Sequence, residues 1–175
     1  SNWKDHEGIS GWLVDGTYQL VSILSGMGIL PTRNFQESVF ESAAEIDGLK
    51  MNEKIRVKRE GCYACPVRCK QVVGHASDDP EKNIDPAYGA PEYEVIGSIG
   101  SACGIPDMIG VAKGSETVAR YGMDGIGTGM TIAFAMECYQ RGILTKEQTG
   151  GLALTFGNGD LVVELVEMIA RRDGI

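Results

Sequence analysis

Three of the five cysteines of this chain fall within eight residues, in the run Cys62-Tyr-Ala-Cys65-Pro-Val-Arg-Cys69. A C-x-x-C-x-x-x-C spacing closes a tight loop in which three thiolates can converge on one centre. Cationic side chains there would help to keep thiols ionised, unless they simply form a solvated basic face. Three such residues flank the run: Lys58, Arg59 and Arg68. The sequence therefore predicts a metal or redox site at residues 62–69.

Three kinds of site fit this spacing. A [4Fe–4S] cluster takes four thiolates, often three from one compact run and one from elsewhere, and it is the favoured interpretation. A structural zinc site usually takes two separated pairs of ligands. No second pair follows the run, and His75 is the only imidazole nearby. A redox-active or incidental group of free thiols is the third interpretation.

The two remaining cysteines, Cys103 and Cys138, lie in apolar helical patterns. We interpret both as small buried core residues, the usual role of an isolated free cysteine. An odd cysteine count in an acidic chain without a signal sequence does not indicate a disulfide framework.

The composition is that of a globular protein. The 175 residues are 43% hydrophobic and 23% charged, which is enough to bury a core. The formal net charge of −8 argues against a nucleic-acid-binding module and against docking on an anionic membrane. No apolar run approaches the roughly 18 residues that a membrane span needs. The first residues lack the layout of a signal peptide, so a cytoplasmic protein is predicted.

The elements that must position the cysteines are predicted to be mostly helical. An extended stretch at 54–59 leads into the cysteine run, and a polar, turn-rich surface loop follows it at 75–90. A capping box, Asn34-Phe-Gln-Glu37, begins one of the helices, and Gly48 ends it. Helical patterns occupy residues 3–28, 34–48, 95–103, 107–121, 128–140 and 145–150, and a last one begins near Leu161. No alternation of strands and helices occurs, so a single all-α (mostly helical) domain over residues 1–175 is expected. Both ends look cut, which suggests a piece of a longer protein.

Several motifs resemble those of the aldehyde ferredoxin oxidoreductases, which are tungsten-dependent, pterin-containing enzymes. They occur in one collinear order over residues 25–174: the cysteine run, Gly89-Ala-Pro-Glu-Tyr-Glu94, Arg120-Tyr-Gly-Met-Asp124, the stretch 131–142, and Phe156-Gly-Asn-Gly-Asp160. The resemblance implies that this chain is the central helical portion of such an enzyme. An N-terminal domain that cradles the pterin and a later helical domain would then lie outside it.

The resemblance also implies roles for individual residues. Cys62, Cys65 and Cys69 would supply three of the four ligands of a [4Fe–4S] cluster, and the fourth would come from the later domain. Glu94, with Glu92 as the alternative, matches a glutamate near the tungsten, where a carboxylate could relay a proton. Without the resemblance, either glutamate would simply fit the first turn of a helix.

The family's pterin-contacting motif has the form Asp-x-x-Gly-Leu-Asp. Gly122 and Asp124 match it here, whereas the first acidic position is Ala119. The resemblance therefore implies a pterin contact at 122 and 124 and leaves it in doubt at 119. From the residues alone, Gly122 is a helix C-cap and Asp124 a turn residue.

The expected function of the full-length protein is the oxidation of aldehydes to carboxylic acids. Electrons would pass from a tungsten or molybdenum bis-pterin through the cluster to ferredoxin, and the isolated piece would be inactive. One alternative is a non-catalytic helical module with a structural zinc or free-thiol site. Another is a family relative that reduces an aromatic or acyl-thioester substrate. Apolar surface left exposed by missing domains would favour homo-oligomers.

Overall fold

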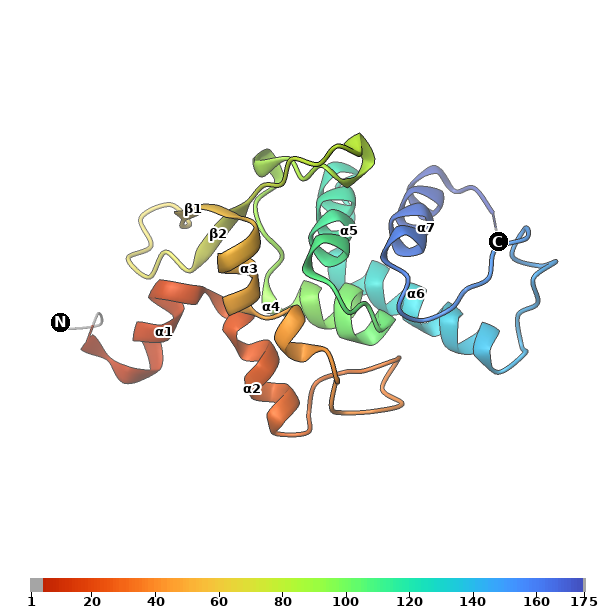
Figure 1. The fold of residues 1–175 in the computed structure, drawn as a ribbon, viewed down its shortest axis with the longest axis horizontal. Helices are drawn as coiled ribbons and strands as arrows, with labels where there is room; N and C mark the ends of the chain where they lie inside the picture. Colours follow the sequence, from red (N-terminus) through yellow and green to blue (C-terminus); the bar gives the residue numbers. More distant parts are fainter. Residues whose placement is uncertain (1–4, 175) are drawn as a thin grey trace.

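The computed structural model describes residues 5–174, and within them the prediction of a mostly helical fold is confirmed (Figure 1). The helices are α1 (Glu7–Asp15), α2 (Leu20–Gly26), α3 (Gly48–Lys54), α4 (Tyr93–Val95), α5 (Met108–Arg120), α6 (Gly125–Gln140) and α7 (Gly159–Arg171). A π-helical turn η6 (Ile96–Gly100) and a 3₁₀ turn η7 (Ser101–Cys103) continue α4. The strands β1 (Arg56–Glu60) and β2 (Lys70–Val73) form an antiparallel hairpin.

The central segment α4–η6–η7 forms the middle of the core. Every residue of η6 and η7 is buried, and α6 packs directly across η6. Gly129 of α6 makes this close approach possible, because a Cβ there would lie only 2.7 Å from the backbone carbon of Ser98. The predicted helix at 95–103 is therefore present, although π and 3₁₀ turns replace most of its regular α-helical geometry.

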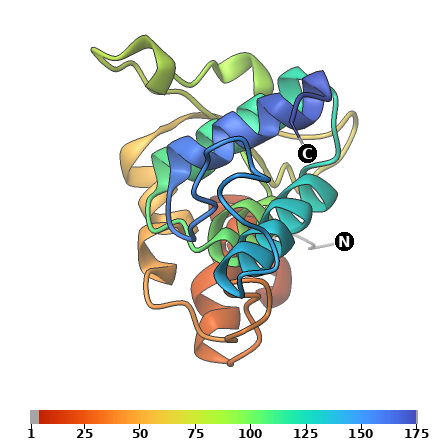
Figure 2. The same ribbon diagram turned by 90° about the vertical axis from the view of Figure 1, so that its right-hand side faces the viewer.

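Each of the three C-terminal helices begins at a residue whose side chain caps it. Asp107, Asp124 and Asn158 each accept a hydrogen bond from a backbone N–H in the first turn of α5, α6 and α7. Gly122, at φ 65°, follows the end of α5. The predicted helices at 107–121, at 128–140 and near Leu161 are thus confirmed, with α6 beginning three residues early at its Asp124 cap. Helix α7 lies along α5 (Figure 2).

The helical pattern predicted at 3–28 is interrupted at Gly16. This residue has φ 71° and separates α1 from the 3₁₀ turn that leads into α2. A Cβ at Gly16 would lie 2.6 Å from the carbonyl oxygen of Cys69, so the chain bends where it contacts the hairpin. Residues 3 and 4 of the predicted helix lie outside the described residues.

The helix predicted at 34–48 is wrong. Asn34 does not cap a helix, because residues 33–35 have positive φ angles and their chain turns back in a tight bridge between Thr32 and Glu37. Its backbone N–H donates instead to the carbonyl oxygen of Ala102, and its side-chain amide donates to Glu137. Gly48 begins helix α3 rather than ending a helix, because the Asp47 side chain accepts a bond from the Lys50 N–H.

The short helix predicted at 145–150 is also wrong. The capping-box bonds between Thr145 and Gln148 do form, at 2.9 Å and 3.4 Å. Gly150 and Gly151 then adopt positive φ angles, which leaves only a turn.

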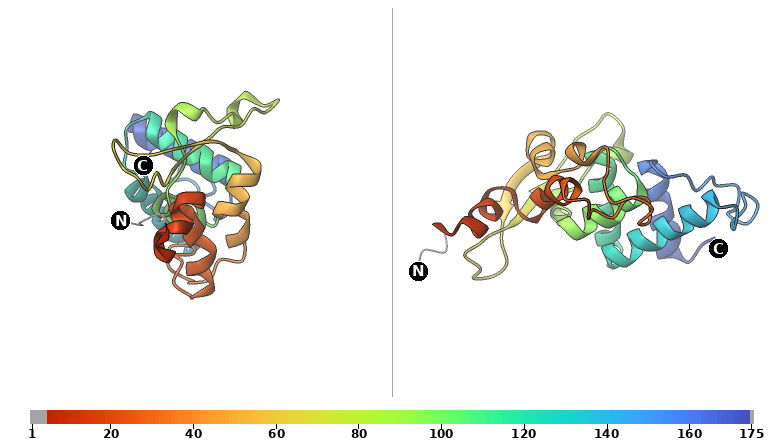
Figure 3. Two further views of the ribbon diagram at one scale, coloured as in Figure 1. Left: turned by 90° about the vertical axis from the view of Figure 1, so that its left-hand side faces the viewer. Right: turned by 90° about the horizontal axis from the view of Figure 1, so that it is seen from below.

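The hairpin confirms the extended stretch predicted at 54–59 and adds the unpredicted strand β2. Arg56 pairs with Val73 and Glu60 with Lys70, so residues 61–69, which include the cysteine run, form the hairpin loop. This loop lies beside α1 at one end of the molecule (Figure 1, Figure 3).

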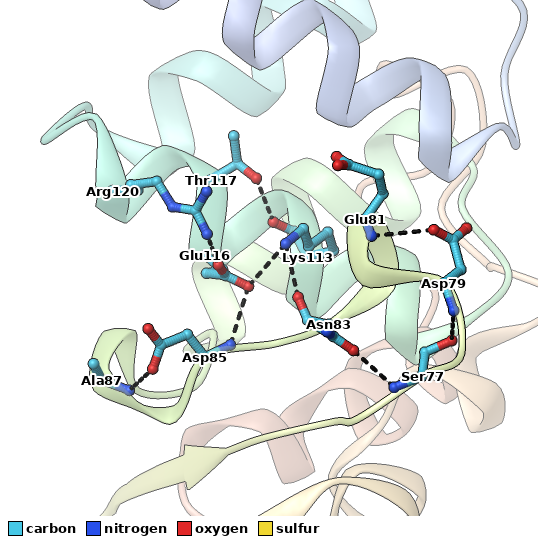
Figure 4. Close-up of polar contacts among 10 residues, drawn as sticks. All are labelled: Ser77, Asp79, Glu81, Asn83, Asp85, Ala87, Lys113, Glu116, Thr117 and Arg120. Carbon is cyan, nitrogen blue, oxygen red and sulfur yellow. Dashed lines mark hydrogen bonds and ion pairs between the residues drawn. The ribbon is translucent and has the colours of Figure 1, made fainter.

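Residues 75–90 cross the outer side of α5. Ile84 in their middle is buried and pairs with His75 through two backbone hydrogen bonds. Lys113 of α5 donates to the carbonyl oxygen of Asn83, and Glu116 accepts from the N–H of Asp85 (Figure 4).

Taken singly, none of the helices within residues 5–174 is long and apolar enough to cross a membrane. The pair Tyr93–Cys103 and Met108–Arg120, bent by 118°, meets the length and composition test jointly.

Candidate functional site

The cysteine loop is a narrow turn closed at its base. A Cβ at Gly61 would lie 2.9 Å from the Cα of Arg68, so the two ends of the loop touch. Inside it, the Cys65 N–H donates to the Cys62 carbonyl oxygen at 3.1 Å. Ala64 and Arg68 have φ angles of 57° and 50°, which bend the backbone back on itself. The loop therefore brings all three cysteines to the end of one hairpin.

The three thiols differ in exposure and form no closed metal site as they stand. Cys62 is exposed, whereas Cys65 and Cys69 are half-buried. Across residues 5–174, no three His, Cys, Asp or Glu side chains are grouped so as to hold a metal ion. The donor set nevertheless fits an iron–sulfur cluster, because all three groups are thiols. Such a cluster often takes three ligands from one compact run, and the fourth would come from outside the loop.

Burial is the main influence on Cys69. It raises the pKa of this thiol, and the nearby Glu92 carboxylate raises the pKa further. The expectation that flanking cations keep the thiols ionised is therefore wrong for Cys69. One of those cations, Lys58, is paired instead with Glu60 at 2.6 Å. Binding of a metal at Cys69 must release a proton that the fold itself helps to retain.

Glu92 lies between the cysteine loop and the start of α4. Its Oε2 accepts a hydrogen bond from the Thr17 hydroxyl at 2.5 Å, and its Oε1 is 3.8 Å from the Lys70 ammonium. Thr17 also accepts a bond from the Tyr93 N–H. These contacts connect the segment after α1, the first residue of β2 and the start of α4, and they leave Glu92 half-buried.

Glu94, two residues further along, is exposed in the first turn of α4. Its side chain takes part in none of the hydrogen bonds or ion pairs found in the described part of the chain. Burial raises the pKa of Tyr93, and the charge of Glu94 raises that pKa further. The two candidate glutamates thus differ: Glu92 is held in place by neighbours, and Glu94 is open to solvent.

Gly122 and Asp124 lie on the turn between α5 and α6. The Gly122 N–H donates to the carbonyl oxygen of Ala119, and Asp124 Oδ2 accepts from the Gly127 N–H at 2.5 Å. Both residues are exposed. The structural roles of helix end and helix cap account for both residues.

Gln71 was not identified from the sequence. It is 4% exposed in β2, and neither its side-chain nitrogen nor its oxygen has a hydrogen-bond partner. Leaving such a group unpaired costs about 1–3 kcal/mol. Thr17 and Lys70, the partners of Glu92, were also missed, because only the fold brings them to residues distant in sequence.

The isolated cysteines have structural surroundings. Cys103 is fully buried, and its Sγ lies 3.4 Å from the carbonyl oxygens of Ser98 and Gly129, either of which can accept its single S–H. Burial raises the pKa of Cys103 to about 12. The prediction of a buried core residue is confirmed for Cys103, whereas Cys138 is only partly buried.

A family model and several known proteins match this chain, and they point to the same family. The family model for aldehyde ferredoxin oxidoreductase, domains 2 and 3, matches residues 1–175. The tungsten-containing aldehyde ferredoxin oxidoreductase of Pyrococcus abyssi is 37% identical over 165 residues, covering 91% of this chain and 26% of that protein. The corresponding protein of Thermococcus kodakarensis is 37% identical over 161 residues, covering 90% of this chain and 25% of that protein.

A protein of Pyrococcus furiosus named aliphatic sulfonate oxidoreductase, WOR-like subunit, is 34% identical over 146 residues, which cover 83% of this chain and 23% of that protein. The chain thus spans about a quarter of the length of these relatives. With its full length matched by the family model, the chain belongs to the aldehyde ferredoxin oxidoreductase family.

Proposed function

We propose that the full-length protein oxidises aldehydes to carboxylic acids and delivers the electrons to ferredoxin through a [4Fe–4S] cluster. In this reaction one water is added, the aldehyde loses two electrons, and two protons leave with formation of the neutral acid. Two ferredoxins then take one electron each. The observation that carries the proposal is the three-cysteine hairpin loop in a chain of this family.

Cys62, Cys65 and Cys69 would hold the cluster, and the fourth thiolate would come from outside this chain. When bound, the cluster supplies single-electron transfer and a tungsten or molybdenum bis-pterin supplies two-electron chemistry. Gly122 and Asp124 are the proposed pterin contacts. Asp124 Oδ2 is occupied by the Gly127 N–H, whereas its Oδ1 accepts no hydrogen bond within residues 5–174 and could take one from a ligand. This chain alone would be inactive, because it provides neither a fourth cluster ligand nor the pterin-cradling domain.

Glu94 is the proposed proton relay, with Glu92 as the alternative. A relay must exchange its proton during turnover, and the exposed Glu94 carboxylate has no competing partner among the described residues. The Glu92 carboxylate already accepts a hydrogen bond from Thr17 and lies near Lys70, so both of its oxygens have partners.

Replacement of the relay by its amide should lower turnover without removing the cofactors. We expect Glu94→Gln to reduce kcat about 10²-fold or more, the usual size of a general acid–base contribution, at wild-type iron and tungsten content. Steady-state kinetics with an aldehyde and ferredoxin measure this. A wild-type kcat in Glu94→Gln, together with a large loss in Glu92→Gln, would transfer the role to Glu92.

The metal site is tested by composition. Full-length protein purified without oxygen should contain about four irons with matching acid-labile sulfide, plus tungsten or molybdenum. Cys62→Ala should lose most of the iron, whereas Cys138→Ala on α6 should keep it. Zinc alone, with no sulfide and no tungsten or molybdenum, would exclude the oxidoreductase and leave a helical module with a structural metal.

A second candidate is a family member with another substrate, such as an aromatic or acyl-thioester compound. One specific observation favours it: a relative with 34% identity is named an aliphatic sulfonate oxidoreductase, so substrates within the family vary. This chain also departs from the family motif at Ala119, where the motif has an acidic residue. This candidate would be supported if the protein, at full cofactor content, reduced ferredoxin with no aldehyde in a panel of aldehydes.

A further inference from the structure

The amide of Gln71 is the one buried side-chain group within residues 5–174 whose polar atoms lack any hydrogen-bond partner. Native proteins pair most buried polar groups, so an unpaired amide at this depth indicates that a partner is missing. An amide has two N–H donors and one acceptor oxygen, so it can bond a group that only accepts.

The position of Gln71 indicates where that partner lies. It is the second residue of β2 and follows Cys69, the last residue of the cysteine loop, by two positions. Gly16 contacts both residues: a Cβ there would lie 2.6 Å from the Cys69 carbonyl oxygen and 3.5 Å from Cγ of Gln71.

The other neighbours of Gln71 do not supply the partner. Tyr18 packs beside Gly16 at this point, but its hydroxyl already donates to Asn52 at 2.9 Å. Arg59, the residue paired with Gln71 across the hairpin, is exposed, and the next residues of β2 are buried valines. The amide is thus enclosed where the hairpin meets the bend after α1, next to the residue that ends the cysteine loop.

We propose that Gln71 is a positioning residue whose amide N–H donates a hydrogen bond to a sulfur atom of the cluster held by the cysteine loop. This inference rests on the proposed function. Sulfide and thiolate sulfurs in a cluster only accept hydrogen bonds, which matches the donors that Gln71 leaves unpaired. Each such bond stabilises the more negative, reduced cluster and therefore raises its reduction potential.

The test is a redox titration, monitored by electron paramagnetic resonance, of full-length protein prepared without oxygen. Gln71→Leu keeps the side chain's bulk but removes the donors. We expect its potential to become more negative, so that the ratio of reduced to oxidised cluster at a fixed potential falls up to tenfold, equivalent to about 59 mV for one electron. Gln71→Glu, which adds negative charge, should shift it in the same direction.

The matched control is Val72→Ala. Val72 is the next residue in β2, is equally buried and points to the opposite face of the hairpin. It reports any change in potential caused by loosened packing alone, and we expect its potential to equal that of the wild type.

The outcomes separate the inference from the proposed function. A wild-type protein without iron and sulfide overturns both. A wild-type protein with a cluster, whose potential is unchanged in Gln71→Leu or is shifted equally in Val72→Ala, overturns the role of Gln71 alone. Loss of iron from both Gln71 variants, with wild-type melting temperature and an intact Val72→Ala protein, supports a direct contact.

Discussion

At the scale of single residues, surroundings decide what each cysteine of this chain can do. Cys103 is enclosed by the core and can donate to either of two backbone carbonyls, whereas Cys69 is half-buried beside the Glu92 carboxylate. Burial raises the pKa of both thiols, because it penalises the thiolate. Cys103 is therefore an inert core group, whereas Cys69 would need a bound metal to become a thiolate in the proposed site.

The buried thiol of Cys103 should make stability fall at high pH. Its pKa rises from 9.0 to about 12 in the folded chain. The contribution of this thiol to the free energy of unfolding is complete below pH 9. It is lost as the pH rises toward 12, because the unfolded state releases the proton first. By pH 10 the loss is on the order of 1 kcal/mol. Urea unfolding from pH 7 to 10 measures it.

The free energy of unfolding of Cys103→Ala should decline less over the same pH range, whatever the stability of this variant at pH 7. Because tyrosine ionisation affects both proteins, the difference between the two slopes isolates Cys103. Equal slopes would contradict the assignment.

At the scale of elements, a buried carboxylate holds residues 75–90 against α5. Glu116 is buried; its Oε2 accepts from the Asp85 N–H at 3.3 Å and pairs with the Lys113 ammonium at 3.4 Å. Its other oxygen pairs with Arg120 (Figure 4). The Arg120 guanidinium in turn lies 5.7 Å from the centre of the Tyr88 ring. Glu116 therefore anchors the loop to α5, together with the bond from Lys113 to the Asn83 carbonyl oxygen.

Removing this carboxylate should loosen the loop as well as destabilise the chain. Glu116→Ala leaves the mostly buried Lys113 without its counter-charge, so we expect the free energy of unfolding to fall by about 3 kcal/mol. Amide hydrogen exchange in residues 75–90 should accelerate. Urea unfolding and exchange mass spectrometry measure the two effects.

The matched control is Glu167→Ala, which removes the same type of Glu–Arg pair, one helical turn apart, from the surface of α7. Exposed pairs of this kind contribute about 0.5 kcal/mol or less. Similar losses from both variants would show that burial of Glu116 is not the source of its effect.

At the scale of the whole molecule, stability depends on the crossing of α6 over the buried π-helical turn η6. The two backbones meet at Gly129, where a Cβ would lie 2.8 Å from the Ile99 backbone nitrogen as well as against Ser98. Neither backbone can move without disturbing the rest of the core, because η6 also contacts α5.

Gly129→Ala should therefore destabilise the fold by about 1–3 kcal/mol, the usual cost of overpacking. Gly97→Ala, in the turn η6 that α6 crosses, is the control, because a Cβ at Gly97 meets no atom within 4 Å. We expect Gly97→Ala to be neutral or slightly stabilising, as loss of glycine freedom in the unfolded chain predicts. Thermal unfolding that ranks Gly97→Ala below Gly129→Ala would contradict this account of the crossing.

Features that depend on near neighbours in the chain can be predicted from the amino-acid sequence alone. The spacing of Cys62, Cys65 and Cys69 predicts their shared loop because eight residues cannot carry them far apart. Asp107 predicts the start of α5 because a cap acts within its own first turn. The family motifs belong with these features, because they are runs of adjacent residues.

Other features of the fold depend on contacts between distant segments, which outweigh local conformational preference. Asn34 has a sound capping sequence, yet bonds to Ala102 and Glu137 direct its backbone elsewhere. Strand β2 forms because β1 is there to pair with it, and this pairing buries Gln71 without a partner. Glu92 reaches the cysteine loop through Thr17 and Lys70, neither adjacent to it in sequence. A short sequence pattern contains no information about such contacts, because their free energy comes from segments that only folding brings together.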